Sequence, residues 1–275
     1  MNFFVRLRRL FRRIPPLYWS VGVARYVHFQ ARLRSENKRH SAEGMGDVPP
    51  PQLRHRVHGA LDLESYLNAG RVLGSSIVQE FETHGIGQRA AGILDFGCGP
   101  GRIAKVVKDL RPHWRLFGCD IDGEAVSWAR SNLAGVAEFS ASAQNPPLSY
   151  ATEQFDALYS ISVFTHLDEG AQFAWLAELQ RVLRPGGLAL ITTHGVRTLA
   201  SCEPLELEAI QRHGFAYRID RTGALKLDGL PDSYQTAFHS RDYIERTWSR
   251  WFEILQFHEG GLAGHQDVVV LRRRA

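Results

Sequence analysis

The sequence lacks the features of a membrane span, a secreted scaffold and a metal site. None of its apolar runs reaches the ~18 residues that suggest a transmembrane helix. Cysteine occurs three times, at Cys98, Cys119 and Cys202, without a Cys-x-x-Cys pair; this favours a reducing compartment over a disulfide framework. A His-Glu-x-x-His motif and a Cys/His cluster are missing too. We therefore expect a cytoplasmic location, no secretory signal and no catalytic metal.

Positive charge is concentrated near the N-terminus. The whole chain has 33 Lys and Arg against 29 Asp and Glu, a net charge of +4. Residues 1–40 contain ten Lys and Arg but one acid, Glu36, so this segment carries +9 and the remainder −5. Because surfaces that bind nucleic acids are basic, the acidic remainder predicts no nucleic-acid partner.

The N-terminal segment is interpreted as an extension that precedes the main domain. Residues 1–14 place apolar side chains at helical spacing with arginines on the other face. Such a helix lies on an anionic membrane surface or packs on this protein or a partner, and both alternatives stay open. We interpret residues 1–45 as a basic, amphipathic, helical extension and residues 46–60, with their Pro49-Pro50-Pro51 run, as a linker. One domain is expected over 61–275.

The most informative stretch is an apolar strand that runs into three alternating glycines. Residues 92–96 form the strand, Gly97, Gly99 and Gly101 the turn, and a helical pattern follows. Glycine permits a sharp turn and the close approach of a ligand. This order is typical of the nucleotide-binding crevice of an open α/β sheet. The P-loop Lys-Ser/Thr is missing, and Arg102 stands where a dinucleotide fingerprint needs its third glycine.

The Gly-x-Gly-x-Gly spacing, with Asp95 two residues ahead, resembles the first motif of the class I S-adenosylmethionine-dependent methyltransferases. The resemblance implies S-adenosylmethionine as the cofactor, with Asp95 holding the methionine ammonium directly or through water. It also implies that Gly97, Cys98, Gly99 and Gly101 lie against that cofactor.

Three later motifs extend the resemblance. Asp120, 19 residues past Gly101, follows a short apolar strand at the place where an acid accepts both ribose hydroxyls. Ile121 resembles the residue that packs on the adenine. Residues 155–160 look like the family's fourth strand, whose last residue, Ser160, is expected at the cofactor, and residues 181–187 look like its helix–turn before the fifth strand.

The segment after the third strand departs from the family pattern. Family members often have an Asp there that accepts from the adenine amine, whereas residues 139–145 contain no acid. We assign this contact to Ser142, with Gln144, Asn145 or backbone groups as alternatives. The missing acid also leaves open a protein that binds the cofactor without turnover.

Strands that alternate with helices predict a parallel sheet with helices on both faces. The expected fold class is α/β: a Rossmann-like, doubly wound, mainly parallel seven-stranded sheet with N-terminal helices. Residues 214–239 break the alternation and are interpreted as a late inserted substrate flap. Strands are expected at 92–97, 115–119, 136–140, 155–161, 187–193, 251–258 and 265–272, and helices at 62–83, 101–111, 123–134, 169–183, 203–213 and 240–248.

The reacting end of such a sheet lies beyond the carboxyl ends of strands four and five. Methyl transfer from a sulfonium is an in-line displacement, and a base helps when the acceptor is a hydroxyl. His166 and His194 follow these two strands, so we assign them as catalytic candidates, with a hydrogen bond to a loop as the alternative. From the flap, Tyr234 and His239 are assigned to the substrate.

The favoured function is transfer of a methyl group from S-adenosylmethionine to a small-molecule acceptor. Residues 162–167, the late flap and residues 266–271 resemble methyltransferases that modify sugars of surface polysaccharides or glycolipids, so a sugar or glycolipid hydroxyl is the first expectation. A quinone, phenolic or other aromatic acceptor is the alternative, favoured by the flap aromatics. Residues 1–14 would make the protein membrane-peripheral. The sequence leaves the oligomeric state open.

Overall fold

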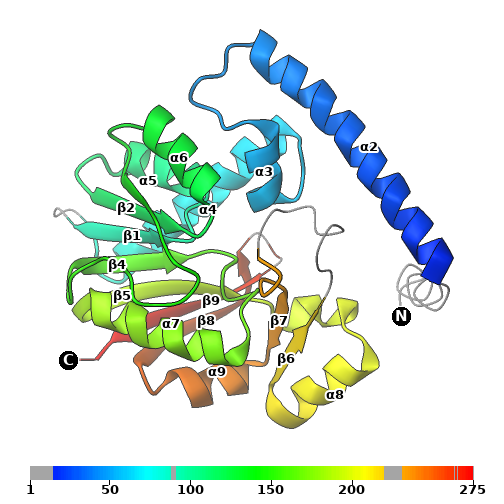
Figure 1. Ribbon diagram of the computed structural model, residues 1–275. Coiled ribbons are helices and arrows are strands. Elements are labelled where there is room, and N and C mark those ends of the chain that lie inside the picture. Colours follow the sequence, from blue (N-terminus) through cyan, green and yellow to red (C-terminus); the bar gives the residue numbers. More distant parts are fainter. Residues whose placement is uncertain (1–14, 88–90, 220–230, 263, 265, 275) are drawn as a thin grey trace.

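The computed structural model describes residues 15–87, 91–219, 231–262, 264 and 266–274, and its centre is one seven-stranded sheet (Figure 1). The strand order is β3-β2-β1-β4-β5-β9-β8. The strands are β1 (Gly92–Phe96), β2 (Arg115–Asp120), β3 (Glu138–Ala141), β4 (Phe155–Ser160), β5 (Leu183–Thr193), β8 (Phe252–Leu262) and β9 (Gln266–Arg273).

The pairing confirms the predicted α/β fold with a mainly parallel sheet. Strands β1 to β5 pair in parallel, while β9 runs antiparallel to β5 and β8 antiparallel to β9. The order reverses between β1 and β4, as expected for a doubly wound sheet, so a crevice opens beyond their carboxyl ends.

Two apolar cores lie on the two faces of this sheet. Successive side chains of a strand point to opposite faces, and Ile93 and Leu94 of β1 accordingly belong to different cores. The first core receives Phe81 and Val107 from the helices, and the second receives Leu176. The helices are α4 (Leu63–Thr83), α5 (Arg102–Leu110), α6 (Gly123–Asn132), α7 (Glu169–Val182), α8 (Pro204–His213) and α9 (Arg241–Trp248).

Helix α4 begins and ends where the sequence predicts. Asp62 is its N-cap, and the carboxylate accepts from the backbone N–H of Ser65 at 2.7 Å. This bond satisfies one of the amide donors that a helix start leaves without a partner.

The interpretation of residues 46–60 as a linker is wrong for its second half, because this stretch contains helix α3 (Pro51–His58). Proline at the first helical position needs no amide partner, so Pro51 starts the helix instead of breaking it. Gly59 ends it with φ 71°. Leu53 and Arg54 are buried, which anchors α3 on the domain.

The N-terminal extension is a single long helix, α2 (Pro15–Ala42), which extends away from the sheet (Figure 1). It touches α3 through the rings of Phe29 and His55, whose centroids are 4.5 Å apart, and through Glu36, 3.9 Å from Arg54. The predicted amphipathic segment 1–14 lies outside the described residues. Among the described helices, none is both long and apolar enough to cross a membrane.

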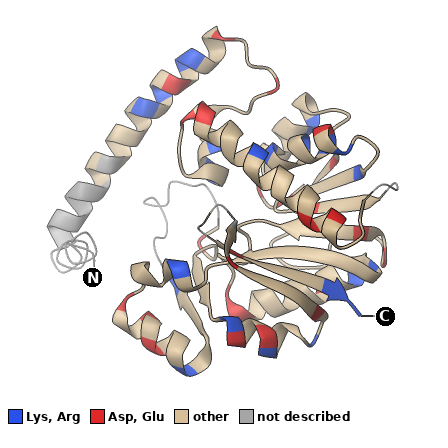
Figure 2. Ribbon diagram, turned by 180° about the vertical axis from the view of Figure 1, so that it is seen from behind, with Lys and Arg blue, Asp and Glu red and all other residues tan. Residues whose placement is uncertain are grey.

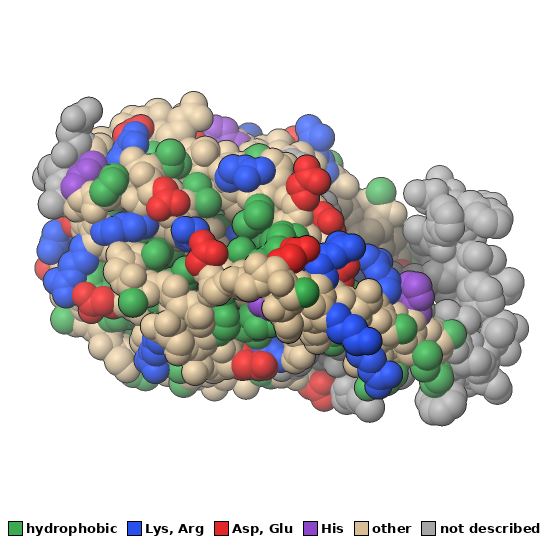
Figure 3. All heavy atoms as spheres, turned by 90° about the horizontal axis from the view of Figure 1, so that it is seen from above, with side chains coloured by type: hydrophobic (Ala, Val, Ile, Leu, Met, Phe, Trp, Pro, Cys, Tyr) green, Lys and Arg blue, Asp and Glu red, His purple; other side chains and the backbone are tan. Residues whose placement is uncertain are grey.

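Charged side chains of both signs are spread over the described surface. Figure 2 shows basic residues on α2 together with an acidic one, and acidic residues recur on the helices of the domain. From above, blue and red side chains alternate over the visible face instead of forming one continuous basic surface (Figure 3).

The predicted flap is present as an antiparallel hairpin. Strand β6 (Phe215–Arg218) pairs with β7 (Thr236–His239), and residues 220–230 between them lie outside the described part. The 3₁₀ helix η1 (Val196–Ser201) and α8 lead from β5 into this hairpin. The hairpin is a separate two-stranded sheet, which explains why residues 214–239 interrupt the alternation of strands and helices.

Candidate functional site

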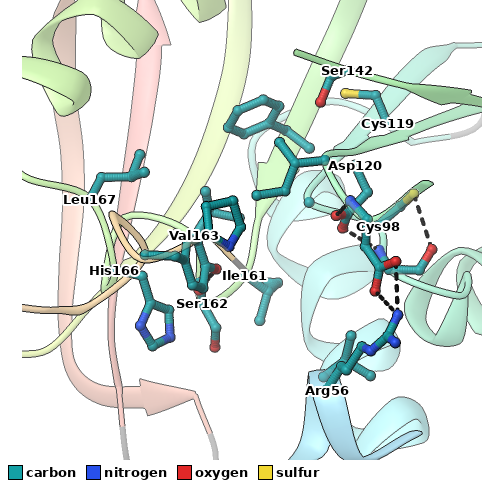
Figure 4. Close-up of a pocket in the computed structure, with 18 of the residues that line it drawn as sticks. Arg56, Cys98, Cys119, Asp120, Ser142, Ile161, Ser162, Val163, His166 and Leu167 are labelled. Carbon is teal, nitrogen blue, oxygen red and sulfur yellow. Dashed lines mark hydrogen bonds and ion pairs between the residues drawn. The ribbon is translucent and has the colours of Figure 1, made fainter. Parts of the chain in front are cut away.

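A cavity of about 610 Å³ lies beyond the carboxyl ends of the parallel strands, a size typical of small-molecule sites. Figure 4 shows its two sides, with Arg56, Cys98 and Asp120 on one and Ser162 and His166 on the other. Its walls come from α3, the glycine turn, the ends of β2, β3, β4 and β5, α7, the segment before β7 and the start of β9. Among the lining residues are Val57, Phe96, Gly97, Cys98, Gly99, Cys119, Asp120, Ile121, Ser142, Asn145, Ser162, His166, Trp175, His194, Tyr234 and Gln266.

The glycine turn adopts backbone conformations that favour glycine. Gly97 has φ 87° and Gly99 has φ 51°, in the left-handed region that other residues reach at a cost. A Cβ on Gly97 would lie 2.2 Å from Val163, and one on Gly99 would lie 2.5 Å from Val57. Both glycines are therefore required by conformation and by space.

The carboxylate of Asp120, at the end of β2, stabilises this turn through hydrogen bonds with backbone amides. One oxygen accepts from the Gly99 N–H at 2.7 Å and the other from the Asp122 N–H at 2.8 Å. Burial raises the pKa of Asp120, and these backbone bonds oppose that rise. Asp120 lines the cavity, and its predicted contact with the ribose stays a prediction.

Three predicted cofactor residues do not line the cavity. Asp95 is 3% exposed, burial raises the pKa of its carboxyl to about 8, and its Oδ2 accepts no hydrogen bond from the described residues. Ser160 is fully buried in β4. Gly101 faces the core, since a Cβ there would lie 2.7 Å from Leu133 and 3.0 Å from Phe139. The predicted contact of these three residues with the cofactor, which for Asp95 is direct or through water, therefore stays a prediction.

Helix α3 forms a wall that the sequence prediction missed. The Arg56 guanidinium donates to both carboxylate oxygens of Asp122, at 3.0 and 2.8 Å, and to Glu124 at 2.6 Å. Arg102 donates to the Val57 carbonyl at 3.2 Å. These contacts fasten α3 across the glycine turn. The proline run hid this helix, although Pro51 at its start, Gly59 at its end and the Leu53-to-Val57 spacing are signals of a helix.

At the other end of the cavity, His166 and His194 face each other with ring centroids 6.1 Å apart. Nδ1 of His166 is hydrogen-bonded to the carbonyl of Gln235, and Nδ1 of His194 to that of Ala237 at 3.2 Å. A carbonyl only accepts, so each Nδ1 is the donor, and in the neutral ring Nε2 is the basic nitrogen. Each histidine is thus held as a defined tautomer by the flap.

The two flap residues predicted to contact substrate have different locations. Tyr234 lines the cavity. His239 does not: it is 1% exposed, its Nε2 donates to Gln172 at 3.0 Å, and burial lowers its pKa to about 3. The substrate assignment of His239 is therefore wrong, because β7 directs this side chain into the core beside Trp248.

No group of three or more His, Cys, Asp or Glu in the described part of the chain is arranged to hold a metal ion.

Comparison with known proteins gives one family. Residues 93–187 match the model of a methyltransferase domain. The domain belongs to the class I S-adenosylmethionine-dependent methyltransferases. The match begins in β1 and ends in β5, so it contains the glycine turn, Asp120 and His166.

The methyltransferase domain also has relatives and structural neighbours. A malonyl-[acyl-carrier protein] O-methyltransferase of Hahella chejuensis is 34% identical over 111 residues, 40% of this chain and 39% of the relative. A trans-aconitate 2-methyltransferase of Azoarcus is 33% identical over 106 residues, 37% and 38% of the two chains. The chain thus spans about two fifths of the length of these relatives. A solved methyltransferase from Methanosarcina mazei has a TM-score of 0.51 at 19% identity and covers 70% of this chain and 97% of its own, a likeness of fold.

The cavity of the methyltransferase domain fits S-adenosylmethionine. The glycine turn leaves no Cβ between ligand and backbone, and Asp120 lies in the wall beside it. Asp95 is buried behind the turn, and a nearby cationic group would favour the charged form of its carboxyl. Ile121 and Ser142 line the same half of the cavity.

Replacement of Asp120 by Ala is expected to weaken S-adenosylmethionine binding by about 1–3 kcal/mol, because it removes the predicted acceptor of the ribose hydroxyls and the hydrogen bond to Gly99. Calorimetric titration measures this change. Asp109→Ala, on the exposed face of α5, is the matched control and should leave the dissociation constant unchanged. Equal affinities for wild type and Asp120→Ala would show that the ribose lies elsewhere.

Proposed function

We propose that this protein transfers the methyl group of S-adenosylmethionine to a hydroxyl oxygen of a small molecule, with a sugar or glycolipid as the favoured acceptor. The observation that carries the proposal is the pair His166 and His194, whose basic Nε2 atoms belong to rings in the wall of the same cavity as the cofactor turn. A base at this place serves an acceptor that must lose a proton, as a hydroxyl does.

The bound cofactor supplies an activated methyl group on a sulfonium with a good leaving group. Transfer to an acceptor hydroxyl would require that the hydroxyl lose its proton, and Nε2 of a histidine would take that proton. The residues of the chain align the two reactants and exclude water: α3 covers the cofactor half, and the flap covers the acceptor half. We assign the base to His166, and to His194 a contact with the acceptor.

The acceptor half has polar side chains that suit a molecule with several hydroxyls. Ser233 and Gln266 line the cavity that contains His166, and both have side chains that donate and accept hydrogen bonds. Gln144 donates to Ser233 at 2.6 Å and so joins the end of β3 to the flap. Trp175 and Tyr234 add aromatic surface, which favours a sugar ring and also suits the alternative acceptor, a phenol or quinone.

The names of the relatives add carboxylic acids to the acceptors that should be tested. The malonyl-[acyl-carrier protein] and trans-aconitate methyltransferases take carboxylic acids by their names. A carboxylate is already deprotonated at neutral pH and needs no base. A base fixed as one tautomer therefore favours a hydroxyl acceptor over a carboxylate here.

The test is a transfer assay with radiolabelled methyl S-adenosylmethionine. Sugars, glycolipids, phenols, quinones and carrier-linked carboxylic acids are supplied in parallel. Label in a sugar or glycolipid, lost in His166→Gln, is the expected result. Label in the carboxylic acids alone, or in a hydroxyl acceptor at an unchanged rate in His166→Gln, would overturn the assignment. S-adenosylmethionine binding with no transfer to any acceptor would favour a protein that holds the cofactor without turnover.

We further propose that the protein associates peripherally with anionic membranes through its N-terminal extension. Val23, Tyr26 and Val27 of α2 share one face by their spacing and are 37%, 44% and 60% exposed. Arg32 and Arg34 are exposed further along the helix. Apolar side chains with nearby arginines suit an anionic lipid surface.

The membrane proposal is tested by flotation with anionic and neutral vesicles. The full chain is expected to float with anionic vesicles alone, and a variant without residues 1–14 should lose most of this binding while keeping its affinity for S-adenosylmethionine. Absence of the intact protein from the anionic vesicle fraction would remove the idea.

A further inference from the structure

The segment that follows β4 contacts the flap at several points around His166. The ring of Tyr234 stacks on the imidazole of His166, with centroids 4.4 Å apart and planes 25° apart. The Tyr234 hydroxyl donates to the backbone carbonyl of Ser162 at 2.9 Å. The next flap residue, Gln235, donates its N–H to the His166 carbonyl at 3.1 Å and accepts from the His166 ring.

Ser162, the anchor of Tyr234, has a backbone conformation that only neighbouring contacts can maintain. Its φ is 60°, in the left-handed region that disfavours a residue with a Cβ. Its N–H donates to Thr192 Oγ1 at 2.8 Å, and its hydroxyl accepts from Gln266 Nε2 at 2.8 Å. Such strain persists where the surroundings determine it, and it concentrates at functional sites.

We infer that Tyr234, anchored on the strained Ser162, is a positioning residue that holds His166 as the Nδ1–H tautomer at the acceptor end of the cavity. The inference rests on the proposed function of His166, and it changes the sequence assignment of Tyr234 from a substrate contact to a support of the base. The stacked ring limits rotation of the imidazole, and the Ser162 anchor holds that ring in place. The Gln235 carbonyl then receives the Nδ1 proton, so Nε2 stays basic.

The arrangement explains why the flap belongs to the site, and it involves only flap residues that follow the undescribed segment 220–230. Tyr234 and Gln235 connect the flap to the end of β4, and Gln266, at the start of β9, supports the same point from the sheet. A reacting group needs such support, because a displacement of about 1 Å can lower a rate by about a hundredfold.

The test begins with Tyr234→Phe, which keeps the stacked ring and removes only the anchoring hydroxyl. Tyr217→Phe is the matched control: Tyr217 belongs to the same hairpin, and its hydroxyl donates to the carbonyl of Ser233, next to Tyr234. Each variant loses the one hydrogen bond that its tyrosine hydroxyl donates to a backbone carbonyl. Only Tyr234→Phe loses the bond to Ser162.

Nitrogen-15 spectra of imidazole-labelled protein give a readout that does not need an acceptor, with the His166 signal assigned from its loss in His166→Gln. In wild type and Tyr217→Phe the signal should show the Nδ1–H tautomer. In Tyr234→Phe it should shift toward the tautomer mixture of a free imidazole. An unchanged His166 signal in Tyr234→Phe, or an equal shift in Tyr217→Phe, overturns the inference.

Activity gives the second readout once an acceptor is known. Tyr234→Phe should lower kcat about tenfold with little change in the affinity for S-adenosylmethionine, and Tyr217→Phe should stay within about twofold of wild type. Equal losses in both variants would overturn the inference. A tautomer shift without any methyl transfer in the wild type would keep the positioning role and reject the proposed function, so the two failures are distinguishable.

The strained residue provides an independent variant pair. Ser162→Gly and Ser162→Ala both lose the bond to Gln266, but glycine adopts φ 60° without strain. We expect Ser162→Gly to keep the His166 tautomer and Ser162→Ala to loosen it. A glycine variant that loosens His166 as much as the alanine variant would show that the backbone conformation of Ser162 does not position the base.

Discussion

Replacement of His166 by glutamine is expected to lower kcat about 10²- to 10⁴-fold, the usual contribution of a general base. Glutamine keeps a donor and an acceptor but cannot take a proton at neutral pH. The affinity for S-adenosylmethionine should stay close to that of the wild type, because His166 lies at the opposite end of the cavity from the glycine turn (Figure 4). Single-turnover kinetics with calorimetric titration separates these two quantities.

Two further histidine variants test the specificity of this effect. His194→Gln should have a smaller effect, since we assign it a contact with the acceptor, so KM should rise more than kcat falls. His213→Gln, on the exposed end of α8, is the matched control and should change neither constant. A His166→Gln enzyme with wild-type kcat would mean that the transfer proceeds without this base.

Replacement of Gly99 by valine is expected to abolish measurable cofactor binding. The conformation with φ 51° costs a β-branched residue about 1–2 kcal/mol. The new Cβ would also lie 2.5 Å from Val57, which forces α3 away from the turn, and overpacking of this kind costs about 1–3 kcal/mol. Both costs are relieved if the turn and α3 move apart, which removes the surface that the cofactor needs, so titration with S-adenosylmethionine should detect no binding.

Gly123→Ala is the matched control for Gly99→Val. Gly123 starts α6 close to the same cavity, has no positive φ, and its Cβ would meet nothing within 4 Å. Thermal unfolding shows whether each variant is folded. A folded Gly99→Val protein with wild-type affinity would contradict the location of the cofactor at this turn.

The part of the site that follows the strand ends could be predicted from the sequence. Gly97 and Gly99 follow β1, Asp120 ends β2, and His166 and His194 follow β4 and β5. In a parallel sheet these ends meet at one edge, so a residue's place in the chain determines its place in the site. Local order was sufficient here, since each side chain lies within a few residues of a strand whose apolar run is visible.

The position of a residue in the chain did not predict its role where that role depends on the direction of the side chain. Tyr234 and His239 are both polar aromatic residues of the flap, yet one lines the cavity and the other is buried against Gln172. Ser160 and Gly101 stand in motif positions but face the core. The orientation of such residues depends on what packs behind them, which the motif does not contain.

By itself, the sequence determined the α/β fold, the glycine turn and the family, because strand and helix periods and turn chemistry are local properties of the chain. The tertiary structure alone decided that α3 covers the turn and that Gln266, 104 residues after Ser162, supports the end of β4. It also decided that backbone carbonyls of the flap accept hydrogen bonds from the rings of His166 and His194. These contacts join segments far apart in the chain, and their energies depend on packing that arises only when the sheet has formed.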